Sequence, residues 1–364
     1  MNYKILTNIR IMKKNLMIIL LIIMSNKMYS QKEMKDYESS CYCSFSGTHP
    51  FQIIDEGNNW ELLVALKEGK TIDELNKIGI KYTQKQIEVL QAMNLIENKD
   101  KKYKTLITIL NAEETDEIRA ETKEIAKKIV SIIQSDYTFF SKTLKEQKFE
   151  NSIYSVFFSY VLDNIVWRKF ESNKVLPEIE ISAEKPIWDG TIWFNYPKRI
   201  FECGTNSISY KNLTAATNWS DTSKLSYTEI VDYNTVLTDL DINSKITDSK
   251  VKDTLVKYGI CDTNGKLKVP FIKKDTTNNF NICCNQIADK IFNYLDKNVD
   301  FSTIEKKYNI QSKGDAIIII YHDIMWDILD LLEEIGQIKK PNAFSYPENS
   351  KPADLKDLFF IYEK

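Results

Sequence analysis

The residue types best suited to binding a metal ion lie together in the segment CYCSFSGTH. Cys41, Cys43 and His49 offer two thiol groups and an imidazole within nine residues. Zn(II) or Cu(I) accepts such a set when a fourth ligand or an open position completes it. In an oxidising compartment, however, such cysteines pair more often with other cysteines. We therefore predict no metal and no other cofactor, and keep the three residues only as candidate ligands.

Disulfide bonds are the alternative use of the cysteines. Six cysteines allow fifteen fully paired connectivities, and the sequence does not choose among them. A bond between the adjacent Cys283 and Cys284 would close a strained ring, so a bond from one of them to Cys261 is favoured. Some thiols could instead stay reduced and packed. The candidates are Cys41, Cys43, Cys203, Cys261, Cys283 and Cys284.

Residues for acid–base or nucleophilic catalysis are few. The chain has two histidines, so a catalytic triad would depend on His49 or His322. His322 lies in the apolar stretch IIIIYHDIMW, where a histidine packed in the core is expected. The sequence contains no Gly-rich phosphate loop, HExxH helix or nucleophile elbow. These observations favour a protein without enzymatic activity.

A group of lysines could bind a partner through a short hairpin. The stretch MNLIENKDKKYKTLITIL reads as the end of a helix followed by a basic β-hairpin. Lysines at such a turn attract phosphate groups, but most often they are only solvated. The helix before the hairpin has no arginine to read base edges, so nucleic acid is not the expected partner. The candidate residues are Lys99, Lys101, Lys102 and Lys104.

Aromatic residues form a second candidate surface. The segment 185–220 reads as two or three strands followed by a loop, and in it Trp188 and Trp193 could stack against a peptide or a glycan. Exposed apolar patches are uncommon on soluble proteins. Packing of the Trp-rich face onto helices is therefore the favoured interpretation.

The elements that carry the lysines begin at Asn59. Apolar spacing predicts short helices in NWELLVALKEG, TIDELNKIG and YTQKQIEVLQAMNLI, with Thr71 and Thr83 as N-caps and Glu74 completing a capping box. The hairpin follows directly. This order resembles the winged helix-turn-helix fold of MarR-like regulators over roughly 56–110. The resemblance implies the fold, but such folds also occur without DNA binding.

Similar patterns return later in the chain. A long amphipathic helix (114–144) and a more apolar one (152–171) follow the hairpin. LQAMNLIENKD is then matched by LVKYGICDTNG, EIAKKIV by QIADKIF, and the pair Tyr160 and Trp167 by Tyr321 and Trp326, each about 160 residues on. We predict a mainly α protein with small β-hairpins (α+β), built from two winged-helix-like halves at 56–215 and 216–364 by an internal duplication. An N-terminal Cys-containing segment (31–55) precedes them.

The first thirty residues have the form of a secretory signal. Lys13 and Lys14 precede the apolar run LMIILLIIM, which is too short to span a bilayer. The end MYS-Q resembles signal peptides of the Bacteroidetes type, and cleavage is expected between Ser30 and Gln31. Removal of residues 1–30 leaves a net charge of about −7, which repels nucleic acid. We expect an exported protein, periplasmic or secreted, without a membrane span after cleavage.

These features predict an exported, non-enzymatic protein whose winged-helix-like modules serve structure or the binding of another protein. The first alternative is a DNA-binding winged-helix regulator with a misread N-terminus. The second is a peptide- or glycan-binding protein, or a hydrolase, that uses the Trp-rich segment.

Overall fold

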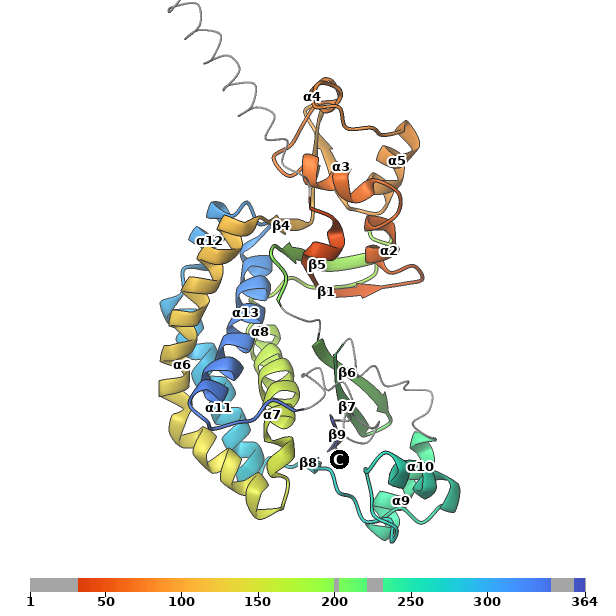
Figure 1. Cartoon of the computed structure of the whole chain (residues 1–364), viewed down its shortest axis with the longest axis vertical. Coiled ribbons are helices and arrows are strands. Elements are labelled where there is room, and N and C mark those ends of the chain that lie inside the picture. Colours follow the sequence, from red (N-terminus) through yellow and green to blue (C-terminus); the bar gives the residue numbers. More distant parts are fainter. Residues whose placement is uncertain (1–31, 200–202, 221–231, 342–356, 364) are drawn as a thin grey trace, which may run out of the picture. The chain divides into compact units, whose positions relative to one another are not determined.

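The structure is a computed structural model, and it describes residues 32–199, 203–220, 232–341 and 357–363. The predicted signal peptide lies outside the described residues. The protein is mainly α-helical with small β-sheets, as predicted. It forms two compact units (Figure 1). The first contains the described residues up to Ile109 together with Glu180–Pro197, and the second contains Leu110–Ile179 and the described residues from Lys198 on.

The boundary between the units differs from the predicted boundary between 215 and 216. The two helices expected at 114–144 and 152–171 belong to the second unit, while the segment Glu180–Pro197 returns to the first. The first unit is therefore discontinuous in the sequence, which local patterns do not reveal.

The first unit contains the three predicted short helices, α3 (Asn59–Ala65), α4 (Ile72–Lys77) and α5 (Gln84–Ala92). The predicted caps are confirmed. Glu74 N donates to Thr71 Oγ1 at 3.2 Å, and Thr71 N donates back to Glu74 Oε2 at 2.7 Å. Thr83 caps α5 in the same reciprocal way with Gln86. These bonds satisfy backbone donors that the first turn of a helix leaves free.

The predicted hairpin is formed by β2 (Ile96–Lys99) and β3 (Lys102–Thr105), which pair antiparallel. The two residues between them, Asp100 and Lys101, both have positive φ angles, of 53° and 65°. This is the backbone of a two-residue type I′ turn, whose twist matches that of the strands it joins.

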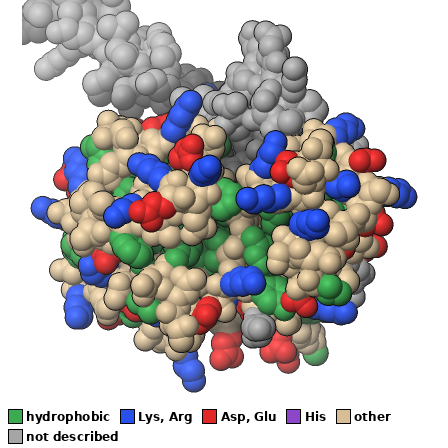
Figure 2. Space-filling view, turned by 90° about the horizontal axis from the view of Figure 1, so that it is seen from below, with side chains coloured by type: hydrophobic (Ala, Val, Ile, Leu, Met, Phe, Trp, Pro, Cys, Tyr) green, Lys and Arg blue, Asp and Glu red, His purple; other side chains and the backbone are tan. Residues whose placement is uncertain are grey.

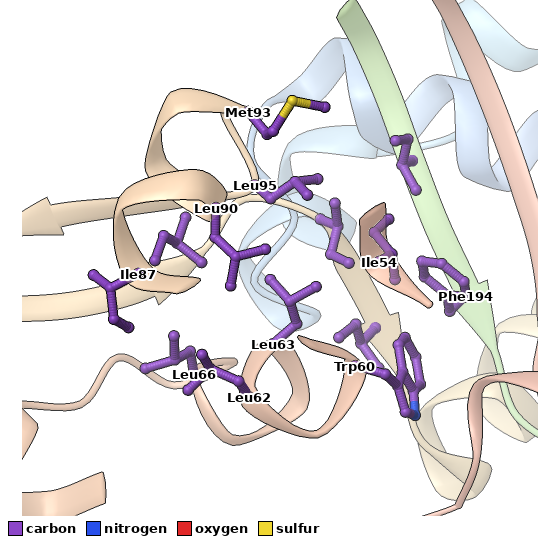
Figure 3. Packing of buried hydrophobic residues seen from close by; sticks show 14 of the residues in the cluster. Ile54, Trp60, Leu62, Leu63, Leu66, Ile87, Leu90, Met93, Leu95 and Phe194 are labelled. Atoms are coloured by element: carbon purple, nitrogen blue, oxygen red, sulfur yellow. The ribbon is translucent and has the colours of Figure 1, made fainter. Parts of the chain in front are cut away.

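A three-stranded sheet completes the first unit. Its strand order is β1-β5-β4, and its elements are β1 (Glu38–Phe45), β5 (Trp188–Asn195) and β4 (Thr108–Leu110), with η1 (Met34–Asp36) and α2 (Pro50–Ile54) on either side of β1 in the chain. Figure 3 shows how the buried side chains of the helices meet the sheet, with Leu62, Leu63 and Leu90 on one side and Trp60 near Phe194. Burial of this apolar surface is the main source of the unit's stability.

The second unit contains a bundle of long helices (Figure 1). α6 packs against α11 and α13, and α11 also packs against the apolar helix that follows α6. That apolar helix is continuous but changes type, with a π-helical middle section, η3. The bounds are α6 (Ala112–Glu146), η2 (Glu150–Ser152), α7 (Ile153–Ser155), η3 (Val156–Val166), α8 (Trp167–Ser172), α11 (Asn279–Asn298), α12 (Phe301–Lys307) and α13 (Lys313–Glu334).

A four-stranded sheet in the second unit has the order β6-β7-β9-β8, with β8 parallel to β9 and the other pairs antiparallel. Two short helices lie between β7 and β8 in the chain. Their residues Leu240 and Leu255 form a core with Leu213 of β7 and Phe360 of β9. The hairpin predicted near Asn264 is reduced to an isolated bridge between Cys261 and Leu267. The bounds are β6 (Cys203–Tyr210), β7 (Leu213–Ser220), α9 (Tyr233–Asn243), α10 (Ser249–Lys257), β8 (Phe271–Lys274) and β9 (Asp357–Glu363).

Within the described ranges, none of the helices combines the length and the apolar character needed to cross a bilayer. Figure 2 shows one face of the molecule, where hydrophobic side chains gather in the centre and are bordered by basic and acidic side chains in alternation. On this face neither sign of charge dominates.

Candidate functional site

The structure brings the candidate metal ligands together. Cys41 and Cys43 lie on β1, His49 is the N-cap of α2, and their ligand atoms all lie within 4.8 Å of one another. His49 Nδ1 accepts a hydrogen bond from Phe51 N at 3.2 Å, so a neutral ring carries its proton on Nε2. Nε2 is the nitrogen that faces Cys41 Sγ, at 4.0 Å. A metal ion there would have to displace that proton, so the geometry fits a thiol pair better than a metal centre.

The other described cysteines, Cys261, Cys283 and Cys284, are buried and do not belong to this group. Cys283 Sγ donates to Asp136 O at 3.2 Å, whereas Cys261 Sγ lies 3.8 Å from Lys252 O. Burial raises the pKa of Cys283 to about 11 and raises that of Cys284 as well. Cys41, Cys43, Cys283 and Cys284 are free thiols, so the expected bond from Cys261 to Cys283 or Cys284 is not formed. The side chain of Cys203 lies outside the described residues.

The predicted lysines lie on the β2–β3 hairpin as expected. Lys99, Lys101 and Lys102 are exposed and Lys104 is half-buried. The helices and the hairpin nevertheless balance their charges, with nine lysines and nine acidic residues between positions 55 and 104. A balanced surface attracts the phosphates of nucleic acid only through its local lysine cluster.

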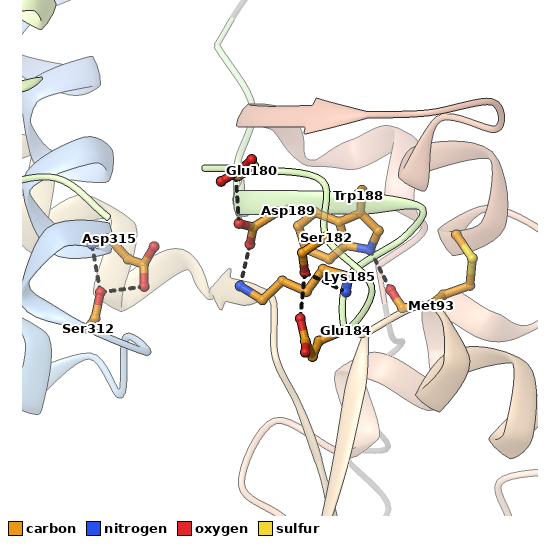
Figure 4. A network of polar contacts seen from close by, with 9 residues as sticks. All are labelled: Met93, Glu180, Ser182, Glu184, Lys185, Trp188, Asp189, Ser312 and Asp315. Carbon is orange, nitrogen blue, oxygen red and sulfur yellow. Dashed lines mark hydrogen bonds and ion pairs between the residues drawn. The ribbon is translucent and has the colours of Figure 1, made fainter. Parts of the chain in front are cut away.

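The two predicted tryptophans are buried, at 5% exposure for Trp188 and 1% for Trp193. The alternative of an exposed aromatic platform is therefore wrong for these side chains, and the interpretation of packed tryptophans is confirmed. Figure 4 shows Trp188 Nε1 donating to the backbone oxygen of Met93, beside the ion pair of Lys185 with Asp189. A buried indole needs such a partner for its N–H. The side chain of Trp219 lies outside the described residues.

A pocket that the sequence did not predict lies in the second unit. Its volume is about 370 Å³, which falls in the range of roughly 300–1,000 Å³ that is common for small-molecule sites. Three elements form its walls: the helix that runs through η3 and α8, the first turns of α11, and the end of β8. The residues that enter the argument below are Tyr160, Asn164, Arg168, Lys169, Lys274, Asp275 and Asn281.

Basic side chains dominate the rim of this pocket. Arg168 and Lys274 share one carboxylate, Glu363, which lies 3.5 Å from Arg168 Nη2 and also pairs with Lys274 Nζ. Lys169 has its own partner, with its Nζ 2.6 Å from Asp289 Oδ1. Arg168 and Lys274 therefore share a single ion-pair partner, and Asp275 is the one acidic residue that lines the pocket.

The pKa of Lys274 reflects this crowding. Burial, together with a smaller contribution from the nearby charge of Arg168, lowers it to about 8, although Glu363 lies beside it. The Lys274 side chain is 21% exposed. A desolvated lysine beside a second cation is stabilised when an anion arrives.

Uncharged polar side chains also line the pocket. Tyr160 Oη donates to Asn281 Oδ1 at 2.8 Å, and Asn281 Nδ2 donates to Lys273 O at 2.7 Å. Asn164 Oδ1 is buried and accepts no hydrogen bond from the described part of the chain. A buried acceptor without a donor is costly, and a hydroxyl group in the pocket would satisfy it.

The helix that runs through η3 and α8 contributes three of these residues. Helices of the π type are rare in runs of any length and are frequent at functional sites. Here 11 residues are π-helical, and Tyr160, Asn164 and Arg168 follow one another at four-residue spacing along the pocket wall. Analysis at the α-helical period treats this stretch only as an apolar core helix, so it gives no signal for a pocket.

Comparison with known proteins adds no relative to this geometry. No protein-family model matches the chain, and no match is found among curated proteins or solved structures. The function is therefore argued from the site itself.

Proposed function

We propose that this protein is an exported, non-enzymatic binding protein that holds a small polar anion in the pocket between η3, α8, α11 and β8. The observation that carries the proposal is the sharing of Glu363 by Arg168 and Lys274 at the pocket rim. In this proposal the winged-helix-like parts serve structure and contacts with another protein.

The charge arrangement supports an anionic ligand. A monoanion placed between Arg168 and Lys274 would supply the second negative charge that the pair lacks. It would also offset the cost of holding Lys274 charged in a half-buried position. Hydrogen bonds to charged donors are about twice as strong as neutral ones, so these two side chains would provide most of the affinity.

The acidic residue of the pocket supports binding rather than catalysis. Asp275 accepts hydrogen bonds from Thr277 N at 2.8 Å and from Thr277 Oγ1 at 2.7 Å. These bonds hold the pKa of Asp275 below its usual value. A carboxylate fixed in this way stays ionised near neutral pH and is a poor proton donor, whereas a general acid needs a raised pKa.

Removal of either shared cation is expected to weaken anion binding. Lys274→Met and Arg168→Gln should each lower the affinity for sulfate about 10- to 100-fold, because one charge-assisted hydrogen bond contributes about 1.5–3 kcal/mol. Isothermal titration calorimetry with sulfate, and then with acetate, measures the affinity directly. Lys266→Met, at an exposed lysine that does not line the pocket, is the matched control and should bind like the wild type.

The pH dependence separates this site from general charge attraction. Sulfate keeps its charge above pH 7, whereas free Lys274 loses its proton as the pH rises through about 8. Affinity should therefore fall above pH 8, by at most about tenfold per pH unit. Lys274→Arg should remove the decline, since arginine stays charged. Equal sulfate affinity in the wild type and both pocket variants would contradict the proposal.

Export is the second part of the proposal and rests on the sequence of residues 1–30. We expect the protein purified from its native host to come from a non-cytoplasmic fraction and to begin at or near Gln31. Cell fractionation with N-terminal sequencing measures both. An intact N-terminus in the cytoplasmic fraction would remove export from the proposal. It would favour the alternative of a DNA-binding winged-helix regulator.

A further inference from the structure

We propose that Cys41 and Cys43 are a redox pair, a dithiol on β1 that small-molecule disulfides oxidise reversibly to an intramolecular disulfide. This site belongs to the first unit and does not depend on the anion pocket. It also assigns a pairing to two of the cysteines for which the sequence alone left the connectivity open.

The position of the two residues on the strand permits the bond but does not favour it strongly. Residues i and i+2 of a strand project to the same face, and here the two Sγ atoms lie within 4.8 Å. Two steps along a strand separate the Cα atoms by about 6.4–6.8 Å, at the upper end of the range of about 4.4–6.8 Å found in disulfides. A bond closed there is strained, and strained disulfides are the ones that are easily reduced again.

The neighbouring strand lies unusually close to the pair. Cys43 lies opposite Gly190 of β5, and a Cβ atom at Gly190 would lie 2.8 Å from Cys43 Cβ and 2.3 Å from Tyr42 O. No other residue could hold the strands this close. Gly190 lies within β5 and allows β1 to approach.

The chemical environment gives the two thiols different pKa values. Cys41 donates a hydrogen bond to Cys43, which lowers the pKa of Cys43 and raises that of Cys41. The first thiolate therefore forms at Cys43, beside the protonated Cys41. His49 Nε2, which carries the ring proton, lies 4.0 Å from Cys41 Sγ and can stabilise the second thiolate when it forms.

The exchange proceeds in two balanced steps. The Cys43 thiolate attacks one sulfur of a small-molecule disulfide, the bond between its two sulfurs breaks, and the released thiolate takes up a proton. Cys41 then loses its proton and attacks Cys43 Sγ, and the second small thiol leaves and is protonated. The protein loses two electrons and two protons, and the small-molecule disulfide gains them as two thiols.

Exposure distinguishes this pair from the remaining described cysteines. Cys41 is exposed and Cys43 is half-buried, whereas Cys261, Cys283 and Cys284 are buried. Reactive thiols are accessible and have a lowered pKa, while buried thiols with a raised pKa are inert. The three buried thiols therefore provide an internal control in the same molecule.

The test uses the full chain equilibrated in mixtures of reduced and oxidised glutathione, followed by alkylation of free thiols and peptide mass spectrometry. We expect Cys41 and Cys43 to lose their thiols together and to regain them as the reduced form is increased. The three buried cysteines should remain thiols throughout and be alkylated once the protein is unfolded for digestion. At pH 7, Cys43 should react with iodoacetamide at least about tenfold faster than Cys283.

Two variants make the result specific. Cys41→Ser should stop at a mixed disulfide between Cys43 and glutathione, because the resolving thiol is gone. His49→Gln should still form the disulfide but more slowly. The proposal is overturned if excess oxidised glutathione forms no bond between Cys41 and Cys43. It is also overturned if the wild type retains Zn(II) against a chelator and Cys41→Ser and His49→Gln both lose it, since the site would then be a metal centre.

Discussion

Replacement of Gly190 with alanine is expected to lower the free energy of unfolding of the first unit by at least about 3 kcal/mol. The added Cβ would lie 2.3 Å from the backbone oxygen of Tyr42 and 2.6 Å from Cys43 Cα, and the φ angle of +134° is itself unfavourable for alanine. The obstructing atoms belong to the backbone of β1, so no side chain can rotate away. Strands β1 and β5 must separate, which breaks their hydrogen bonds.

Urea unfolding followed by tryptophan fluorescence measures this loss, because Trp60, Trp188 and Trp193 are buried in the first unit. Gly47→Ala is the matched control. Gly47 also has a positive φ angle, of +84°, but no heavy atom lies within 4 Å of a Cβ placed there. It should lose only about 1–2 kcal/mol. Equal losses in the two variants would show that backbone conformation alone matters and that the strands are not in tight contact.

The local elements of the first unit could be predicted from the sequence because their signals are local. The caps at Thr71 and Thr83 lie within three residues of the groups they satisfy. The turn at Asp100 and Lys101 joins two strands that are adjacent in the chain. Each of these interactions is encoded by residues a few positions apart.

The β1 strand and the pocket could not be predicted because their partners are distant in sequence. β1 pairs with β5 about 150 residues later. The segment 31–55 alone therefore gave no prediction of a strand, and only its cysteines were recognised. The pocket combines Asn164, Lys274 and Asn281 from three elements. A basic or amide residue on a helix resembles an ordinary surface residue until its neighbours from other elements are known.

The internal duplication stays a prediction, and particular hydrogen bonds support it. Leu95 N donates to Leu90 O at 2.9 Å, and Ile260 N donates to Leu255 O at 2.8 Å, at the ends of α5 and α10. The hairpin bond from Leu106 N to Leu95 O then has its counterpart in the bond from Lys268 N to Ile260 O. Both pairs follow the alignment of LQAMNLIENKD with LVKYGICDTNG.

The order of elements agrees with the same alignment. Asn111 and Asn278 are the N-caps of α6 and α11, the long helices that follow β4 and β8. The strand order β1-β5-β4 of the first sheet matches the order β7-β9-β8 within the second sheet: in each, the strand that comes last in the chain lies in the middle. A duplication accounts for the matching caps and the matching strand orders if, in each copy, the middle strand of the sheet comes after the long helices. In that case β5 and β9 are equivalent strands.

Replacement of Asp163 with asparagine is expected to stabilise the second unit at pH 8 and to have little effect at pH 4. Asp163 lies on η3, where burial raises its pKa to about 7, and only one hydrogen bond, donated by Trp167 Nε1 at 3.0 Å, acts in the opposite direction. In the unfolded chain this carboxyl has a pKa near 3.8. Between these two values the folded protein binds the proton more tightly than the unfolded chain does.

The sign of the effect follows from that difference. Stability falls as the pH rises from about 4 to about 7, because folding then requires either protonation of Asp163 or burial of its charge. Above pH 7 the loss is complete, at about 4 kcal/mol for a shift of this size. Asparagine keeps an oxygen that can accept from Trp167 Nε1 but carries no charge, so Asp163→Asn should recover most of this amount at pH 8.

Urea unfolding of the wild type and the variant at pH 4, 6 and 8 measures the slope. Asp253→Asn, an exposed acid on α10, is the control and should change stability by no more than about 0.5 kcal/mol at every pH. A variant that is equally stabilised at pH 4 and pH 8 would show that packing, not charge, is responsible. A destabilised variant at pH 8 would mean that the Asp163 carboxylate is held by a cation when the protein is folded. In that case the apolar centre of the bundle would not be the cause of the raised pKa.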